Sequence, residues 1–460
     1  MLAALKAIVG ISYRLFVSVG CVRRGTFIAA WLFVVFCGCG RSALDAAFAP
    51  MDGTAPSTQD ADAPAGKAGA SGAAGASGTA GATGTAGVAG ATGFSGAAGG
   101  GDAGESSAAV PDPNVSGNYA INAAHDGAQP TARIASPLRK RWSLDVAEGE
   151  LSYPVLGNGR VFLTMVADGH PAVAAYDLDD GHILWGPTVE SQYLTLAYEG
   201  GRLFGFNQNG VLRAWDGATG RLLWTTALAL VDGQYSFDGL LPVAQGGTVY
   251  AMGDGLGATI YAVDEKTGEV RWHTNDGMSA NTVAIGDGII YTESACYWVF
   301  ALAPLTGEIS TIHSTSCSGG GGRMPFYYRR QLWVPDLTTP GVIIDATGRQ
   351  LGMYSGEPAF HGGLVFYKTS DRLTAMDVAT STTRWTFRPS SSLCTLPVVA
   401  GAGQQVFVGT YDGRIYEVNE ATGAQVSIAD TGVKMVTRCE AMAIASDRLV
   451  WSTGLSVWVY

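Results

Sequence analysis

The sequence has little charge and no excess of basic residues. Charged residues make up 15% of the 460 residues, and the formal net charge is −11. Proteins that bind nucleic acid neutralise phosphates with clustered lysine and arginine, so this balance argues against a nucleic-acid partner. Mild acidity otherwise favours solubility and indicates no particular partner.

Motifs that carry common chemistries are also missing. No Gly-x-Ser-x-Gly elbow accompanies a credible triad, and no helix is predicted after the glycine-rich stretches at Gly253 and Gly319, as a phosphate-binding loop requires. The acidic turn 177–180 lacks the distal glutamate of a calcium loop. His361 could face a central channel, although a hydrogen-bonded structural role is the simpler interpretation. The sequence therefore indicates no catalytic residue, no metal ligand and no cofactor.

The apolar run at residues 26–38 is short for a membrane-spanning helix. It follows Arg23 and Arg24, which is the basic-then-apolar order of a secretory signal. Gly38 and Cys39 then resemble a bacterial lipoprotein cleavage site, where the cysteine takes the lipid. We predict a leader over residues 1–39 with lipidation at Cys39; an ordinary signal peptide or an uncleaved anchor are the alternatives.

Residues 40–132 contain few large apolar side chains and cannot form a packed core, so we predict a disordered tether rich in Gly, Ala, Ser and Thr. From Gly66 to Gly99, glycine falls at every third position, twelve times in succession. That spacing suggests a collagen triple helix, but the run contains no proline, which collagen-like sequences need in quantity. A flexible coil is the favoured interpretation and a collagen-like trimer the alternative.

Residues 133–460 repeat one phrase. Its clearest copy, Ile260 to Trp272, has alternating apolar residues, then Asp264, a turn at Gly268, and a second strand that ends on tryptophan. Similar copies run over 175–185 and 213–224, and weaker ones continue to residue 427. Four short strands with turns every 8 to 12 residues are typical of a propeller blade.

The recurring residues have structural explanations. The aspartate accepts backbone N–H bonds of its own turn, and the glycine supplies a positive φ. The tryptophan places a large ring between neighbouring blades. We therefore assign none of them to catalysis.

Counting the units predicts an all-β, eight-bladed propeller of four-stranded antiparallel blades over residues 133–460. Seven units begin between Tyr153 and Leu396, and the segment 441–460 supplies three further strands. The missing strand is predicted around Trp142, so that the N-terminal strand pairs with the C-terminal blade and closes the ring without an open edge.

This repeat resembles the tryptophan-docking repeat of the PQQ-like propeller family. The family includes quinoprotein dehydrogenases and an outer-membrane propeller lipoprotein of the β-barrel assembly machinery. The dehydrogenases imply a quinone pocket and a pair of adjacent cysteines, and this sequence has no such pair. Eight blades behind a lipoprotein signal are more similar to the assembly lipoprotein, from which the long glycine-rich tether departs.

Four of the seven cysteines fall in the repeat region. Cys394 and Cys439 precede the inner strands of successive blades, so a disulfide between blades seven and eight is expected. Cys296 and Cys317 should emerge on the same face of blade four and form a second pair. An even count in an exported protein favours disulfides, and four free buried thiols are the alternative.

These observations predict an exported protein, periplasmic or at the cell surface, anchored to the outer membrane by its N-terminal lipid. We expect a monomer without cofactor whose propeller binds an envelope protein partner as a non-enzymatic scaffold. The alternative is a sensor or quinoprotein-like enzyme that binds PQQ, a quinone or a sugar at the channel mouth. A trimeric adhesin would follow only from the collagen interpretation.

Overall fold

The computed structural model describes residues 112–460 except 147–148, 230–233, 238–239, 256–258, 275–281, 295–296, 316–322, 336–339, 434–435, 437–438 and 440. The predicted leader, with Cys39, and the glycine-rich tract lie outside the described residues. Cys296 and Cys317 also lie outside them, so their predicted pairing stays a prediction.

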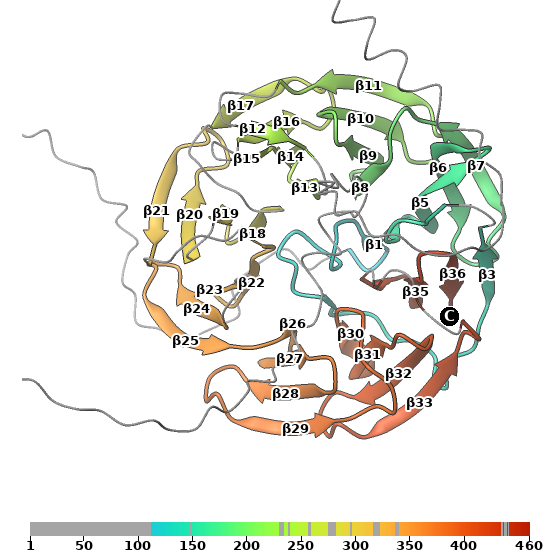
Figure 1. The fold of residues 1–460 in the computed structure, drawn as a ribbon, viewed down its shortest axis with the longest axis vertical. Helices are drawn as coiled ribbons and strands as arrows, with labels where there is room; N and C mark the ends of the chain where they lie inside the picture. Colours follow the sequence, from blue (N-terminus) through green and yellow to red (C-terminus); the bar gives the residue numbers. More distant parts are fainter. Residues whose placement is uncertain are drawn as a thin grey trace, which may run out of the picture. The chain divides into compact units, whose positions relative to one another are not determined.

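The described residues form an eight-bladed β-propeller, which confirms the predicted fold class (Figure 1). Each blade is an antiparallel sheet whose first strand lies toward the centre of the ring and whose fourth lies on its rim. Short strands joined by tight glycine turns form each small sheet. The strands are apolar because each sheet buries both of its faces against the neighbouring blades.

The strands of the first four blades are listed here from the inner strand to the outer one. Blade 1 contains β4 (Val155–Gly157), β5 (Arg160–Ala167), β6 (His170–Asp177) and β7 (Ile183–Val189), and blade 2 contains β8 (Leu194–Glu199), β9 (Arg202–Asn207), β10 (Val211–Asp216) and β11 (Leu222–Ala227). Blade 3 contains β13 (Val243–Gln245), β14 (Thr248–Met252), β16 (Ile260–Asp264) and β17 (Val270–Thr274), and blade 4 contains β18 (Ala284–Gly286), β19 (Ile289–Ser294), β20 (Trp298–Leu302) and β21 (Ile309–His313). A separate pair, β12 (Gln234–Ser236) and β15 (Asp254–Gly255), lies beside blade 3.

The other four blades follow the same order. Blade 5 contains β22 (Phe326–Tyr328), β23 (Gln331–Val334), β24 (Gly341–Asp345) and β25 (Gln350–Tyr354), and blade 6 contains β26 (Glu357–His361), β27 (Leu364–Lys368), β28 (Leu373–Asp377) and β29 (Thr383–Phe387). Blade 7 contains β30 (Val398–Ala400), the 3₁₀ turn η2 (Gly401–Gly403), β31 (Gln405–Gly409), β32 (Arg414–Asn419) and β33 (Gln425–Asp430), and blade 8 contains β34 (Ala443–Ala445), β35 (Arg448–Ser452), β36 (Ser456–Val459) and β3 (Trp142–Asp145).

Blade 8 is built from two distant parts of the chain. β3 pairs antiparallel with β36, with Trp142 opposite Val459 and Asp145 opposite Ser456. The backbone N–H of Arg141 also donates to the Val459 carbonyl at 2.8 Å. The outermost strand of the last blade therefore precedes the first blade in sequence.

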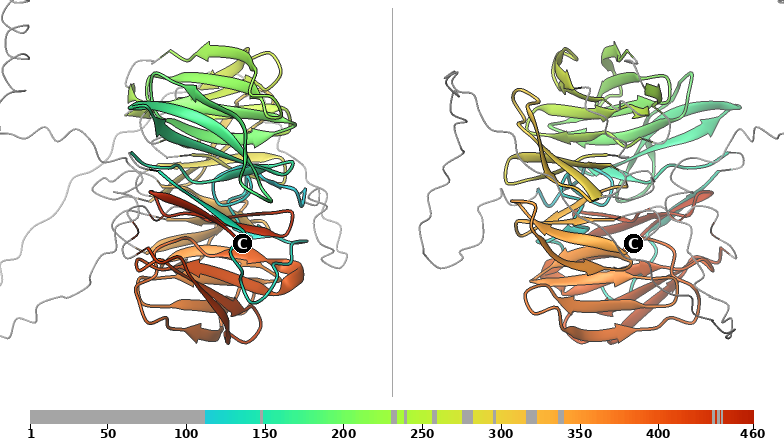
Figure 2. Two further views of the ribbon diagram at one scale, coloured as in Figure 1. Left: turned by 90° about the vertical axis from the view of Figure 1, so that its right-hand side faces the viewer. Right: turned by 60° about the vertical axis from the view of Figure 1, so that its left-hand side comes forward.

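The segment before β3 corrects the predicted domain boundary. We expected a tether through residue 132, but residues 112–132 lie in the centre of the ring, in cyan in Figure 1, and the side views of Figure 2 place them among the blades. Tyr119 and Ile121 are each 2% exposed, and His125 is fully buried. The ordered domain thus includes residues that composition had assigned to the tether, and we call residues 112–132 the central segment.

The central segment hydrogen-bonds to all eight blades. In blade 1, β1 (Val115–Ser116) pairs antiparallel with β4, and in blade 7, β2 (Ala128–Gln129) pairs in parallel with β30. The other blades each contribute a backbone N–H that donates to the segment: Tyr198 to Gly117 O (2.7 Å), Ala244 to Asn118 Oδ1 (2.8 Å), Ile285 to Ala123 O (2.7 Å), Tyr327 to Ala124 O (2.9 Å), Phe360 to Asp126 O (2.7 Å) and Ser446 to Pro113 O (2.7 Å). The segment therefore supplies acceptors to inner edges that would otherwise lack them.

Five of the seams between blades are closed in the same way, by a tryptophan on the outer strand of one blade that packs on a turn of the next. Each ring lies against a turn glycine of the next blade whose φ is between 70° and 76°. Each indole N–H donates to the backbone carbonyl of the second residue of the same turn. The pairs are Trp142–Gly181, Trp185–Gly220, Trp224–Gly268, Trp272–Gly307 and Trp385–Gly423. A side chain at these glycines would collide with the ring, so glycine is needed for space as well as for conformation.

The residue that pairs with the tryptophan position differs between the seams that have the tryptophan and those that do not. In blades 1, 2, 3 and 6, the residue opposite the tryptophan on the third strand is alanine. Where Thr311, Gly352 and Ser427 replace it, the opposing residues are the larger Phe300, Ile343 and Glu417. At the seams after blades 4 and 5, the larger residue on the third strand thus takes part of the volume that the ring fills elsewhere.

We predict that deleting the central segment destabilises the ring. Removal of residues 112–132 takes away backbone hydrogen bonds to every blade, each contributing roughly 0.5–1.5 kcal/mol, so the free energy of unfolding should fall by about 5 kcal/mol or more. Urea unfolding followed by tryptophan fluorescence measures this. Deletion of residues 66–99 is the control and should leave the midpoint unchanged; equal midpoints for the two deletions would contradict the role of the segment.

A second prediction separates ring contact from backbone strain at the turn glycines. Gly220 and Gly201 have φ of 70° and 82°, but a Cβ at Gly220 would lie 2.6 Å from the Trp185 ring, whereas a Cβ at Gly201 meets no atom within 4 Å. Alanine at either position costs about 1–2 kcal/mol for the left-handed backbone. Gly220→Ala should cost about 1–3 kcal/mol more in urea unfolding, because the ring must move. Similar losses for both variants would show that the ring yields freely.

Candidate functional site

The channel is the expected binding site of a propeller, and several polar side chains meet between blades 6 and 7. His361 ends β26, and its Nδ1 lies 2.8 Å from the Glu420 carboxylate. A Cβ at Gly401 would lie 2.3 Å from the His361 Nε2, so the second ring nitrogen packs against the backbone of blade 7. This placement agrees with the structural role predicted for His361.

Asp126 of the central segment belongs to the same polar region. Its carboxylate accepts hydrogen bonds from the backbone N–H of Ala128 at 2.9 Å and from the Asn122 amide at 2.7 Å. Removal from water raises the pKa of Asp126 to about 6, and these two bonds and the charge of His361 oppose the rise. The carboxylate holds the bend of the segment, because Asn122 and Ala128 lie on either side of it.

His125 fixes the tip of the segment against blade 4. Its Nδ1 lies 2.8 Å from the Tyr119 carbonyl and its Nε2 lies 2.8 Å from the Val283 carbonyl. Burial lowers the pKa of His125, while the two carbonyls act in the opposite direction. Both ring nitrogens already have protein partners, so His125 is not placed to transfer a proton to a ligand.

The sequence pattern does not predict these channel residues. Residues 40–132 as a whole are poor in large apolar side chains, and this average composition predicts a tether over the full range. A local change in composition after Pro111 is the one indication of an ordered segment. The glycine repeat has ended there, and Tyr119 and Ile121 appear beside asparagines and a histidine. Ile121 adopts a φ of 80°, which a β-branched residue tolerates only where surrounding contacts hold it.

One group in the described part of the chain has the composition of a metal site. Asp177, Asp180 and His182 each place a ligand atom within 4.8 Å of the others, at an exposed turn. Asp177 Oδ1 already accepts the N–H groups of Asp179 and Asp180, and Asp180 Oδ1 lies 2.5 Å from the His182 Nδ1. These contacts close the turn.

The structure joins Cys394 to Cys439 by a disulfide, with the Cα atoms 5.2 Å apart. Cys394 lies just before the inner strand of blade 7, and Cys439 just before that of blade 8. The Lys368 ammonium of blade 6 donates to the Cys394 carbonyl at 2.9 Å, so three successive blades meet here. Such a crosslink limits the freedom of the closing blade in the unfolded chain.

Comparison with known proteins identifies relatives of the repeat region. The model of the family described as outer membrane protein assembly factor BamB matches residues 173–319 and 329–457. BamB of Yersinia pestis is 28% identical over 184 residues, which cover 38% of this chain and 42% of that protein. The serine/threonine-protein kinase AfsK of Streptomyces coelicolor is 26% identical over 140 residues, or 30% of this chain and 15% of the kinase. The matches thus span less than half the length of either relative.

Solved structures resemble the fold at low sequence identity. Quinohemoprotein alcohol dehydrogenase from Comamonas testosteroni superposes with a TM-score of 0.60 at 15% identity, covering 76% of this chain and 81% of that chain. BamB from Moraxella catarrhalis superposes with a TM-score of 0.53 at 19% identity, covering 70% and 99%. At these identities the likeness establishes the propeller and nothing about chemistry.

The likeness to a quinohemoprotein raises the question of whether a quinone fits the channel. The central segment fills it: Ser116, His125 and Gln129 are fully buried there, and the segment accepts hydrogen bonds from the surrounding blades. A planar quinone in the same space would have to displace these residues. The residues present therefore do not fit a quinone at the centre of the ring.

We predict a pH dependence of stability that originates at Asp126. A carboxyl whose pKa is about 6 when folded and near 4 when unfolded holds its proton more tightly in the folded state. The free energy of unfolding therefore falls as the pH rises from about 4 to 6. Asp126→Asn keeps the acceptor oxygen and removes the charge, so it should gain stability relative to the wild type between pH 4 and pH 7. Urea midpoints at both pH values measure this; a constant difference would contradict it.

Proposed function

Because the chain belongs to the family described as outer membrane protein assembly factor BamB, we propose that it is a cell-envelope protein whose propeller binds another protein and catalyses no reaction. The filled channel carries this proposal. With residues 112–132 occupying the centre, recognition is left to the faces and rim of the ring. Loops and strand edges on a rigid frame suit the binding of a protein surface.

The proposed location follows from the leader and the family. Lipidation at Cys39 would anchor the chain to the outer membrane, facing the periplasm or the cell surface, and residues 40–111 would act as the tether of a monomeric propeller. Among the described residues, no helix has the length and apolar character needed to span a membrane. In this proposal the membrane contact is made by the N-terminal lipid.

The alternative is a propeller that binds PQQ, another quinone or a sugar as a sensor or enzyme. It requires an accessible space near the channel axis with converging polar groups. His125 and His361, the two histidines near the axis, are both held by protein acceptors. This arrangement favours the scaffold over the enzyme.

A combined experiment tests the proposed function. The full-length chain is crosslinked in envelope extract, and the captured proteins are identified by mass spectrometry; in parallel, PQQ and Ca²⁺ are added to the purified chain. We expect one enriched envelope protein and no new visible absorption, because the channel is filled. A stoichiometric quinone spectrum together with no enriched partner would replace the scaffold by the enzyme.

A further inference from the structure

Two glutamates meet where blade 2 contacts blade 3. Glu199 ends the inner strand β8, and Glu265 is the second residue of the turn between β16 and β17. The Glu199 carboxylate accepts the backbone N–H groups of Gly246 at 2.7 Å and of Gly247 at 3.3 Å. The backbone N–H of Glu265 donates to the carbonyl of the same Gly247 at 3.2 Å. One hairpin of blade 3 therefore contacts both glutamates, and their carboxyl groups lie within hydrogen-bonding reach of each other.

The Glu265 carboxyl group is buried, and only one of its oxygens has a basic partner. Oε1 accepts a hydrogen bond from the Arg202 guanidinium at 3.3 Å. No donor among the described residues bonds Oε2, although Glu265 is only 6% exposed. A Cβ at Gly200 would lie 3.3 Å and 3.6 Å from the two oxygens, so the carboxyl group packs directly on the backbone beside Glu199. A buried oxygen that lacks a donor and faces a second carboxyl group is explained by a proton held between the two groups.

The other titratable groups around this pair leave it with one positive charge. Arg202 of β9 is bonded to the pair, as described above. Arg271 of β17 lies on the same side of the blade, but its guanidinium forms a salt bridge with Asp264 at 2.5 Å. Tyr250 of β14 is 4% exposed, and burial raises the pKa of its hydroxyl, which Arg271 opposes and the charge of Glu199 reinforces. Tyr250 therefore stays neutral, and two carboxyl groups share the charge of Arg202.

The corresponding positions between blades 6 and 7 hold a pair that can carry opposite charges. His361 ends β26 as Glu199 ends β8, and Glu420 is the second residue of its turn as Glu265 is. There the glutamate carboxylate lies 2.8 Å from the His361 Nδ1. The same two positions thus join the inner hairpin of one blade to the turn of the next, and between blades 2 and 3 both positions hold an acid.

We propose that Glu199 and Glu265 share one proton at neutral pH and so form a pH-dependent contact between blades 2 and 3, which we call the carboxyl latch. The proton comes from solvent, and it lets one carboxyl group donate to the other. When a rising pH removes the proton, two like charges face each other, and Glu265 is repelled from Glu199. The Glu265 carbonyl accepts the Trp224 indole N–H at 3.0 Å, so the state of the latch reaches the tryptophan contact of this seam. This device is separate from the proposed protein-binding function.

The sign of the pH dependence follows from where the proton is held more tightly. Burial raises the pKa of Glu199 above its ordinary value of 4.5, the two glycine N–H groups oppose the rise, and the charge and hydrogen bond of Glu265 add to it. The folded chain therefore binds the proton more tightly than the unfolded chain does. The stabilisation by the latch is complete below about pH 4.5 and is lost as the pH rises through the raised pKa.

Two variants of the full-length chain test the latch, Glu199→Gln and Glu265→Gln, because an amide donates the hydrogen bond without titrating. Both are made in an Asp126→Asn parent, which removes the other titrating carboxyl discussed above. Between pH 5 and pH 8 the urea midpoint of the parent should shift to lower urea relative to both variants. Glu269→Gln, at an exposed position of the same turn, is the matched control and should follow the parent at every pH. Infrared difference spectra at pH 7 should show a protonated carboxyl band in the parent that both latch variants lack.

Three results would overturn the carboxyl latch. Urea midpoints that change in parallel for the parent and both variants would show that no proton is gained or lost by the pair in this range. An unchanged infrared carboxyl band in both variants would show that both glutamates are ionised in the parent and act as hydrogen-bond acceptors alone. Ca²⁺ that raises the midpoint of the parent and of neither variant would show that a metal ion, and not a proton, joins the two carboxylates. Should one variant fail to fold, the spectrum and midpoints of the other decide the outcome.

Discussion

The fold depends on how the innermost strands of the ring obtain hydrogen-bond partners. Each inner strand has a neighbour on one side only, and its other edge points to the axis, where backbone N–H groups must be satisfied by water or by protein. Here one stretch of about twenty residues, 112–132, accepts from all eight blades. The blades are therefore coupled through the axis as well as through their side-to-side seams, and the space where propellers commonly take ligands is used for stability.

The packing between neighbouring blades depends on three positions whose residues vary together: the outer-strand tryptophan, the turn glycine of the next blade and the residue paired with the tryptophan. A docking tryptophan is accompanied by a turn glycine in the next blade, and in four of the five cases by an alanine on the neighbouring strand. Where blade 6 has Ser381 in place of the turn glycine, blade 5 has Gly352 in place of the tryptophan. The blade 5 turn is one residue shorter, with Gly348 bonded to Asp345, and blade 4 has Thr311 in place of the ring. Packing volume, and not local propensity alone, decides where the motif persists.

The sequence predicted the periodic part of the structure and missed the aperiodic part. Strand count, turn positions and the ring contacts follow from a repeated pattern such as Ile260 to Trp272, in which local preference and burial agree. The central segment has no period and few apolar residues, and its order comes from acceptors that match the inner edges of strands far away in sequence. Such non-local pairing leaves little trace in composition, so Asn118, His125 and Asp126 could not be assigned before the ring was assembled.

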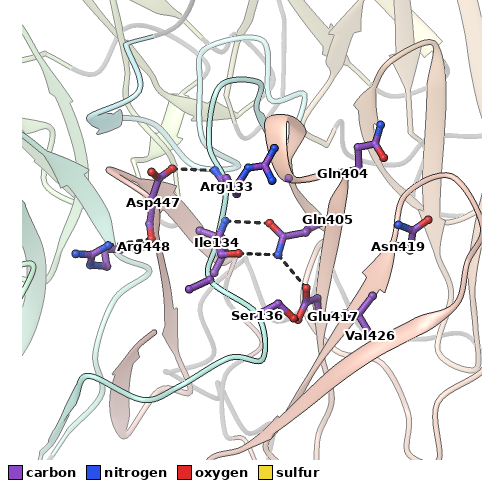
Figure 3. A pocket seen from close by; sticks show the side chains of 12 residues that line it. Arg133, Ile134, Ser136, Gln404, Gln405, Glu417, Asn419, Val426, Asp447 and Arg448 are labelled. Carbon is purple, nitrogen blue, oxygen red and sulfur yellow. Dashed lines mark hydrogen bonds between the residues drawn. The ribbon is translucent and has the colours of Figure 1, made fainter.

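The missing tryptophan of blade 7 is a consequence of how the ring closes. A docking ring needs the turn between the third and fourth strands of the next blade, but in blade 8 these strands are β36 and β3, which come from distant parts of the chain and have no turn between them. A tryptophan in place of Ser427 would have no turn glycine in blade 8 to pack against. The chain instead crosses this seam from the channel to the rim, held by Gln405 and Glu417 (Figure 3). Because a crossing backbone fills space less completely than an indole ring, open spaces remain beside it at the seam that closes the ring.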